Sequence, residues 1–209
     1  RSPWFGLNPG PDLSPAEADK ISPILEKAAK TIQDHFDRSN FAVEIHQCYL
    51  DLIVGGTASL YFEEAQTGEL SAFKFSSAPL THVTLEEGAG GYLDTVYRRL
   101  SLTIEQLRAR YTQAVWPAAL IQRADKDPQE QFKILEAVVP NGLQYNYYAI
   151  LMEDMSAPEL IAHGTFETAP VISFRWIKSP GEIYGRSPVM KALPDIKTAN
   201  KVVELILKN

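Results

Sequence analysis

The sequence predicts an α+β protein: a region of helices and β-hairpins, then a helix, a small β module and a returning helix. The last two helices are expected to pack near one another as a hairpin, with the β module at their shared end. Three observations predict this class. Apolar residues recur at helical spacing near both ends, β-forming runs fill residues 57–100 and 132–176, and glycine or Asn-Gly turns separate those runs. With 45% hydrophobic and 22% charged residues, the 209-residue chain has enough apolar side chains for one moderate core or two small ones.

The first elements are predicted to be two helices. Ser14, Pro15 and Glu17 form a capping pattern, with a serine cap, a proline at the first helical position and a carboxylate at the third. Apolar residues then follow at helical spacing at Ile21, Ile24, Leu25, Ala28, Ile32 and Phe36. Pro23 can divide this segment into a short turn and a main helix. A second helix is expected over Phe41, Ile45, Cys48, Tyr49 and Leu52, ending at Gly55-Gly56.

Two β-hairpins are predicted next. Residues 57–63 and 70–76 flank the turn at 66–69. Residues 81–85 and 93–100 flank the glycine-rich turn at 88–91.

The remaining chain has the order helix, β module, helix. Thr103 and Gln106 form a capping box for a helix that is expected to descend from the hairpins. β-rich runs follow at residues 132–139, 144–153 and 165–176. Ser187 and Pro188 then provide a cap and a first-turn proline, while Pro194 allows a kink or a restart. The apolar stripe of the last helix consists of Ile196, Ala199, Val203, Ile206 and Leu207.

Charge, cysteine content and the chain ends limit the functional classes. The net charge is −6, so no strongly basic surface indicates nucleic-acid binding. The single cysteine, Cys48, excludes an internal disulfide and agrees with a reducing compartment. No apolar run approaches the roughly 20 residues of a membrane span, and no signal peptide is recognised. The start at Arg1 and the end inside a helical pattern indicate an excised piece of a longer protein.

No residue pattern predicts a catalytic, metal or cofactor site. His46, Cys48 and Asp51 contain the residue types of a nucleophilic triad, but His46 and Cys48 point to different helix faces and Cys48 lies on the apolar stripe. A buried structural cysteine is expected instead. The four histidines lack metal-ligand spacing; they are His35, His46, His82 and His163. The run Gly88–Gly91 matches neither a P-loop nor a dinucleotide fingerprint.

Two adjacent carboxylate pairs carry the alternative function, a small soluble hydrolase. The pairs are Glu63-Glu64 and Glu86-Glu87. Neighbouring strand residues point to opposite faces, so at most one member of each pair could line a cleft. A solvated strand edge or turn is the simpler interpretation. A cleft with converging titratable groups would favour the hydrolase.

Three segments resemble the head-to-tail connector, or portal, proteins of short-tailed phages. The most specific is SPGEIYGRSPVMKALPDIK, from Ser179 to Lys197. DTVYRR at residues 94–99, followed by LTIEQL at 102–107, resembles a strand-to-helix passage of the same family, and the two segments come in the family's order. Residues 50–64 give weaker support. The resemblance covers most of residues 40–209.

The resemblance implies a non-enzymatic subunit of a ring, commonly a dodecamer, without cofactors. Residues 1–100 would be the wing, 101–131 the first stem helix and its exit, 132–175 the clip and 176–209 the returning, truncated stem helix, with the crown missing. The implied partners are other copies of the chain, terminase, tail adaptors, scaffold or capsid proteins and passing double-stranded DNA. The implied location is the capsid vertex of the virion, after assembly in the host cytoplasm.

Two surfaces keep two interpretations each. One face of the last helix carries Lys197, Lys201 and Lys208 together with Glu204. This face is either solvated or, in a ring, lines the DNA channel and makes weak contacts with DNA phosphates. The aromatic stretch from Trp176 to Tyr184 is either a binding surface or core at the junction of clip and stem.

Overall fold

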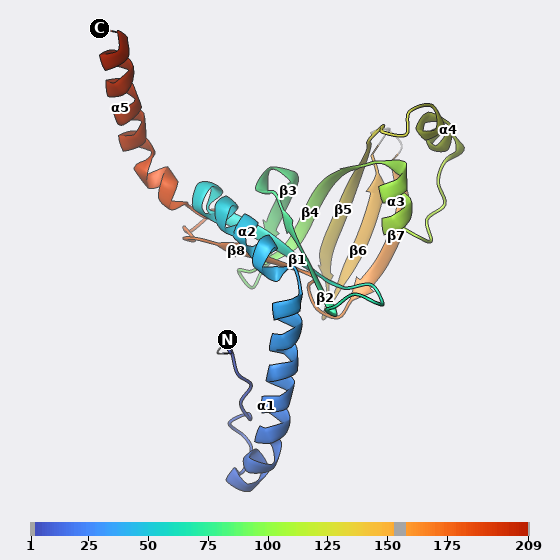
Figure 1. The fold of residues 1–209 in the computed structure, drawn as a ribbon, viewed down its shortest axis with the longest axis vertical. Coiled ribbons are helices and arrows are strands. Elements are labelled where there is room, and N and C mark those ends of the chain that lie inside the picture. Colours follow the sequence, from blue (N-terminus) through green and yellow to red (C-terminus); the bar gives the residue numbers. More distant parts are fainter. Residues whose placement is uncertain (1–2, 153–157, 209) are drawn as a thin grey trace. The chain divides into compact units, whose positions relative to one another are not determined.

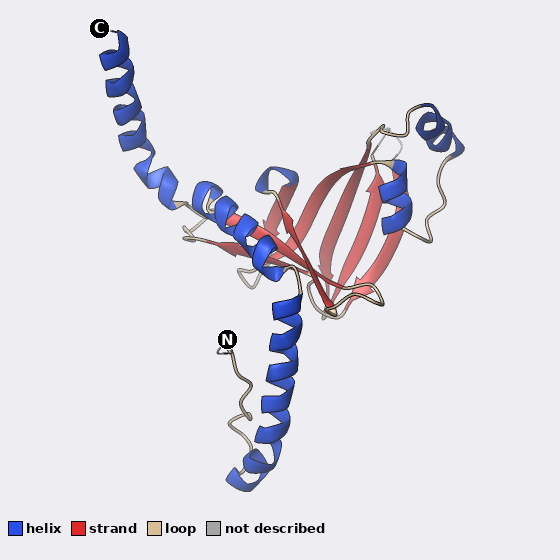
Figure 2. Ribbon diagram, viewed as in Figure 1, coloured by secondary structure: helices blue, strands red, loops and turns tan. Residues whose placement is uncertain are grey.

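The computed structural model describes residues 3–152 and 158–208. These residues form five α-helices, one short 3-10 helix and eight strands in two antiparallel sheets, which confirms the α+β class (Figures 1 and 2). The strand orders are β2-β1-β8 and β3-β4-β5-β6-β7. The helices are α1 (Pro15–Arg38), α2 (Phe41–Gly55), α3 (Ile104–Arg110), α4 (Ala118–Lys126) and α5 (Pro188–Lys208), and the 3-10 helix is η1 (Leu80–His82). The strands are β1 (Thr57–Glu64), β2 (Phe73–Ala78), β3 (Val83–Glu87), β4 (Leu93–Leu102), β5 (Phe132–Asn141), β6 (Gln144–Leu151), β7 (Glu159–Phe166) and β8 (Val171–Arg175).

The chain divides into two compact units. The first comprises the residues up to His46 together with Phe62–Ser76, and the second comprises Gln47–Tyr61 and the residues from Ser77 onward. No helix in the described ranges is long and apolar enough to cross a membrane.

An aromatic cluster holds the first unit together. The predicted cap starts α1, since the Ser14 backbone N–H donates to the Glu17 carboxylate at 3.1 Å, and the helix continues through Pro23 without a break. At its end, the Phe36 ring stacks on Phe75 with centroids 5.5 Å apart. Asn40 fixes the strand that carries Phe75: its amide donates to the Phe75 carbonyl at 2.8 Å and accepts from the Phe75 N–H at 2.9 Å.

The five-stranded sheet dominates the second unit. Strands β4, β5, β6 and β7 pair in sequence order, and β3 extends the sheet at the β4 edge. Helices α3 and α4 cover one part of it, and Figure 1 shows α3 lying against the sheet. The buried residues of this core are Ile104, Leu107, Tyr111, Leu120, Ala124, Phe132, Ile134, Ala149, Leu151 and Ile161.

The region between the hairpins and the β module differs from the expected single helix. Residues 103–131 contain two short helices, α3 and α4, joined through Pro117. Because Leu102 of β4 pairs with Phe132 of β5, α3 starts beside the sheet and buries its apolar residues against it. Among the described residues, this core contains none from α5, so the expected packing of the two helices against one another is not observed. The assignment of residue ranges to wing, stem and clip concerns an assembled ring and stays a prediction.

The last predicted strand does not pair as one strand within the β module. The run at 165–176 contains the end of β7 and all of β8, and β8 pairs with β1, with Ser59 opposite Ser173. The hydroxyls of these two serines are 2.8 Å apart. Residues far apart in the chain thereby join in one sheet, and β8 brings the following segment, which carries the family resemblance, next to the start of β1.

Candidate functional site

The segment from Trp176 to Ser187 is fixed to the junction between α2 and β1. The Trp176 N–H donates to the Gly56 carbonyl at 2.9 Å, and the Gly185 N–H donates to the Thr57 hydroxyl at 2.8 Å. Gly56 has a φ of 77°, and a Cβ atom on Gly185 would lie 2.2 Å from the Gly56 oxygen. Both glycines are therefore required by close backbone contact and, at Gly56, by a left-handed conformation.

A second set of contacts ties this segment to the β3–β4 hairpin. Arg175 and Lys178 form ion pairs with Glu87 at 2.5 and 2.7 Å, and the Leu85 N–H donates to the Tyr184 hydroxyl at 3.2 Å. The hydrogen bonds from Arg175 and then Lys178 hold the pKa of Glu87 below its ordinary value. Glu87, a member of one predicted carboxylate pair, thus stays ionised and serves to hold two chain segments together.

The side chains of the aromatic stretch are only partly covered. Trp176 is 49% exposed and Tyr184 is 38% exposed, while the backbone around them is firmly bonded. None of the side chains from Trp176 to Tyr184 is buried, so the interpretation of this stretch as core is wrong, although its backbone forms part of the junction. A binding role for the stretch stays a prediction.

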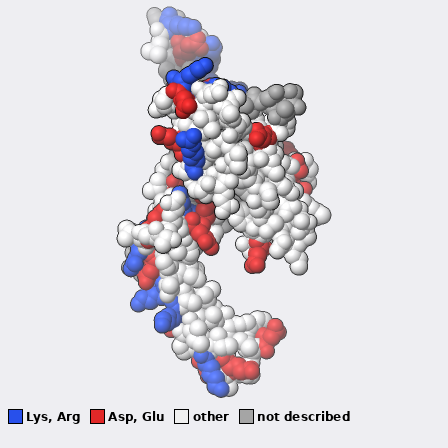
Figure 3. Space-filling view, turned by 90° about the vertical axis from the view of Figure 1, so that its right-hand side faces the viewer, with Lys and Arg blue, Asp and Glu red and all other residues white. Residues whose placement is uncertain are grey.

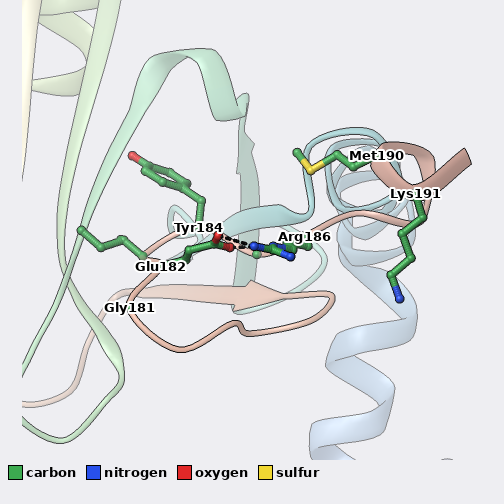
Figure 4. A pocket seen from close by; sticks show the side chains of 8 residues that line it. Gly181, Glu182, Tyr184, Arg186, Met190 and Lys191 are labelled. Carbon is green, nitrogen blue, oxygen red and sulfur yellow. Dashed lines mark hydrogen bonds and ion pairs between the residues drawn. The ribbon is translucent and has the colours of Figure 1, made fainter. Parts of the chain in front are cut away.

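An open groove follows this junction and leads into α5. Figure 4 shows Glu182 and Arg186 pointing toward each other, with Met190 and Lys191 on the first turn of the helix; the two Arg186–Glu182 hydrogen bonds measure 2.9 and 2.7 Å. Ser187 is fully buried, and its hydroxyl accepts from the Met190 N–H at 3.0 Å, which confirms the predicted cap of α5. The groove lining combines apolar side chains with one closed ion pair and one lysine, an arrangement suited to binding rather than to acid–base chemistry.

Helix α5 carries the three lysines proposed for DNA contact. Lys201 pairs with Glu204 at 2.9 Å, and Lys208 pairs with the other oxygen of the same carboxylate. The hydrogen bonds from Lys208 and then Lys201 lower the pKa of Glu204. No ion pair of Lys197 occurs within the described part of the chain. None of the described residues of α5 is buried. On the face of the molecule seen in Figure 3, basic and acidic side chains are interspersed and do not form one basic region.

The candidate triad on α2 does not assemble. Cys48 is 1% exposed and donates its thiol to the Ser59 carbonyl at 3.6 Å, as expected for a structural cysteine. Asp51 accepts from the Leu80 N–H at 2.9 Å, and His46 is exposed. No group of three His, Cys, Asp or Glu side chains among residues 3–152 and 158–208 is arranged to hold a metal ion.

The sequence analysis missed a buried carboxylate, Glu136 on β5. It lies directly opposite Arg98 of β4 and is 1% exposed. Arg98 donates to one carboxylate oxygen at 2.9 and 2.5 Å, and the other oxygen accepts from Arg110, Tyr111 and Tyr147, each at 2.8 Å. The Arg98 guanidinium also lies 3.9 Å above the Tyr61 ring. We call these six residues the Glu136 cluster.

The electrostatics of the Glu136 cluster favour the ionised carboxylate. Burial raises the pKa of Glu136, but the charges of Arg98 and Arg110 and the donated hydrogen bonds outweigh burial and set it at about 2. Burial, followed by the negative charge of Glu136, raises the pKa of the Tyr111 and Tyr147 hydroxyls. Arg98, Arg110, Tyr111 and Tyr147 all donate to this one carboxylate, so the cluster connects neighbouring strands of the sheet. A glutamate at a buried position of an otherwise apolar strand was the signal available in the sequence.

The whole chain, residues 1–209, matches the family described as bacteriophage head to tail connecting protein. The chain belongs to this family, a structural component of the phage virion. Among curated proteins, none matches the sequence.

Proposed function

We propose that the chain is a structural subunit of a ring at the junction of phage head and tail, through which the genome is packaged and later ejected. The family match over the full chain carries this proposal. The ring would stand at the capsid vertex, after assembly in the host cytoplasm, beside scaffold or capsid proteins. It would dock the terminase during packaging and then accept tail adaptors.

The exposed surfaces support a role in assembly. Large apolar side chains remain uncovered on α2, on β8 and along α5, including Leu50, Ile172 and Leu207 at 49%, 55% and 81% exposure. Apolar area of this kind is expected where another protein binds. The groove and the Glu87 ion pairs, by contrast, supply no pair of acid and base for a hydrolase.

The lysines of α5 are proposed to face the DNA channel. Lys197, Lys201 and Lys208 present three positive charges per subunit, of which Glu204 offsets one. The remaining charge per subunit is small, which suits a polymer that must slide past without being held.

The complete gene product, purified and imaged by electron microscopy, tests the proposed ring. Closed rings with a central opening wide enough for double-stranded DNA are expected. A protein that stays monomeric in imaging and in analytical ultracentrifugation, at every concentration and salt level, would overturn the proposal.

A further inference from the structure

Helix α5 is attached to the second unit through the segment that precedes it. None of the described residues of α5 is buried, so the helix itself adds no side chain to a core. Just before the helix, the backbones of Gly56 and Gly185 touch, and the Gly185 N–H donates to the Thr57 hydroxyl at 2.8 Å. We call the contact between Gly56 and Gly185 the glycine pivot. A single attachment of this kind fixes the position of a helix but not its direction.

A second attachment joins the same segment to the β3–β4 hairpin. The Nη1 atom of Arg175 donates both to Glu87, at 2.5 Å, and to the Ile183 carbonyl, at 3.0 Å. Its Nη2 atom donates to the Gly91 carbonyl at 3.1 Å. Lys178 forms an ion pair with the other oxygen of Glu87 at 2.7 Å. We call Arg175, Glu87 and Lys178 the Arg175 latch, which holds Ile183 against the hairpin, two residues before the glycine pivot.

The two attachments differ in how readily they open. The glycine pivot is a buried backbone contact that leaves no room for a methyl group on Gly185. The latch consists of charged side chains, of which Glu87 and Lys178 are 26% and 45% exposed. A further contact with the hairpin, from the Leu85 N–H to the Tyr184 hydroxyl, also depends on a side chain that is 38% exposed. Ion pairs that water and salt can reach contribute little free energy, so the latch opens at a lower cost than the pivot.

We propose that the Arg175 latch sets the direction of α5. With the latch closed, the segment before the helix is held at two places, and α5 keeps one orientation relative to the five-stranded sheet. With the latch open, α5 turns about the glycine pivot, as rigid elements do about a hinge of a few residues. The pivot, the latch and the sheet all lie in the second unit, so this motion belongs to one subunit and does not depend on the proposed ring.

Distances measured by double electron–electron resonance on the purified protein test this inference. Spin labels at Ser101→Cys on β4 and Lys197→Cys on α5 report the direction of the helix, and both positions are exposed. Cys48 is buried and stays unlabelled. Labelled protein is diluted with an excess of unlabelled protein, so that each assembly contains at most one labelled copy. With an intact latch, one narrow distance distribution is expected.

Substitutions in the latch are expected to change this distribution. Glu87→Gln should broaden it and shift its mean, because the latch loses its carboxylate. Arg175→Gln should do the same, and it keeps the inference testable if the first variant fails to fold. Glu86→Gln is the matched control, since it removes an equal charge from the neighbouring, exposed position of β3 and should leave the distribution unchanged.

A second pair of labels shows whether the sheet itself is kept. Ser101→Cys on β4 combined with Thr165→Cys on β7 should give the same distances in every variant. An unchanged distribution between positions 101 and 197 in either folded latch variant would overturn the inference, and so would a broad distribution with the latch intact. A change in the sheet pair as well would show that Glu87 supports the sheet and not the direction of α5, which would also overturn it.

Discussion

At the residue scale, the buried Glu136 carboxylate accepts hydrogen bonds from four side chains. It connects β4, β5, β6 and α3 through Arg98, Tyr147, Arg110 and Tyr111. A buried ion pair adds modest net stability compared with an apolar substitute, but removal of one partner leaves the other charge buried without compensation. Removal of one charged partner is therefore expected to lower the free energy of unfolding more than replacement of the whole cluster by apolar side chains.

Glu136→Gln is expected to lower the free energy of unfolding by about 3 to 5 kcal/mol, because Arg98 would remain buried without a counter-charge. Urea denaturation followed by circular dichroism measures the change. Glu182→Gln is the matched control, since it removes a solvent-exposed ion pair with Arg186 and should leave the transition almost unchanged. Equal urea midpoints for the two variants would contradict the assigned role of Glu136.

The pH dependence of stability provides a separate test of Glu136. Its pKa is about 2 in the folded protein against an ordinary 4.5, so the folded state favours the ionised form. The associated stability, on the order of 3 kcal/mol, is present above pH 4.5 and is lost as the pH falls toward 2. Unfolding free energies measured at several pH values in this interval should decline less steeply for Glu136→Gln than for the wild type. Parallel pH profiles would show that the carboxylate is not held ionised.

At the element scale, the helix caps and the hairpin turns were predictable from sequence. Ser14 and Ser187 start helices as expected, and Gly142 occupies a left-handed turn between β5 and β6, with a φ of 64°. These signals are local, because each depends on residues within one turn of chain. The predicted division of the first helix at Pro23 is wrong, since α1 continues through Pro23 as one helix.

Which helices and strands pack or pair with one another could not be predicted in the same way. The capping box at Thr103 correctly starts a helix, yet the length of that helix and its packing depend on the pairing of Leu102 with Phe132. The run at 165–176 has strand character throughout, but only the tertiary fold decides that β8 pairs with β1. The Glu136 cluster was missed for the same reason, because a sequence shows the glutamate and not the four donors from three other elements.

The contact between Gly56 and Gly185 yields a prediction about the junction before α5. Gly185→Ala is expected to destabilise the protein by about 1 to 3 kcal/mol, since the added methyl group would meet the Gly56 backbone oxygen at 2.2 Å and the Arg175 Cβ at 2.9 Å. Thermal or urea unfolding measures the loss.

Gly164→Ala on β7 is the matched control for this change. Its added Cβ has no neighbour within 4 Å, so the same chemical change should cost nothing there. If Gly185→Ala were as stable as Gly164→Ala, the two backbones would not touch in solution.

At the scale of the whole molecule, substitution of the α5 lysines tests whether DNA transit and ring assembly depend on different sides of this helix. The triple variant Lys197→Gln, Lys201→Gln, Lys208→Gln should form rings as the wild type does, because the apolar residues Ile196, Val203 and Leu207 lie on the other side of the helix. Retention of packaged DNA should change, since weak phosphate contacts repeated around a ring add together, and the difference should shrink at high salt.

Virions carrying the triple variant would be scored for genome length and for DNA leakage over a salt series, with particle imaging as the measure of ring assembly. Val203→Gln is the matched control that should impair assembly and leave the lysines in place. Normal packaging and retention at every salt concentration would leave the lysine side as a solvated surface. Failed ring assembly in the triple variant would place these lysines at a subunit interface instead.

The pairing of Leu102 with Phe132 has a practical consequence for work on the assembled particle. The chain leaves the sheet after Leu102 of β4 and returns to it at Phe132 of β5, directly opposite. The connection between these two residues therefore has both ends fixed side by side in the sheet. Within this connection Gln113 is exposed between α3 and α4, and Val115 is 86% exposed. A short peptide epitope inserted after Gln113 would lengthen the connection without shifting the register of any strand. Such an insertion would give each subunit an external label by which its orientation in the particle can be determined.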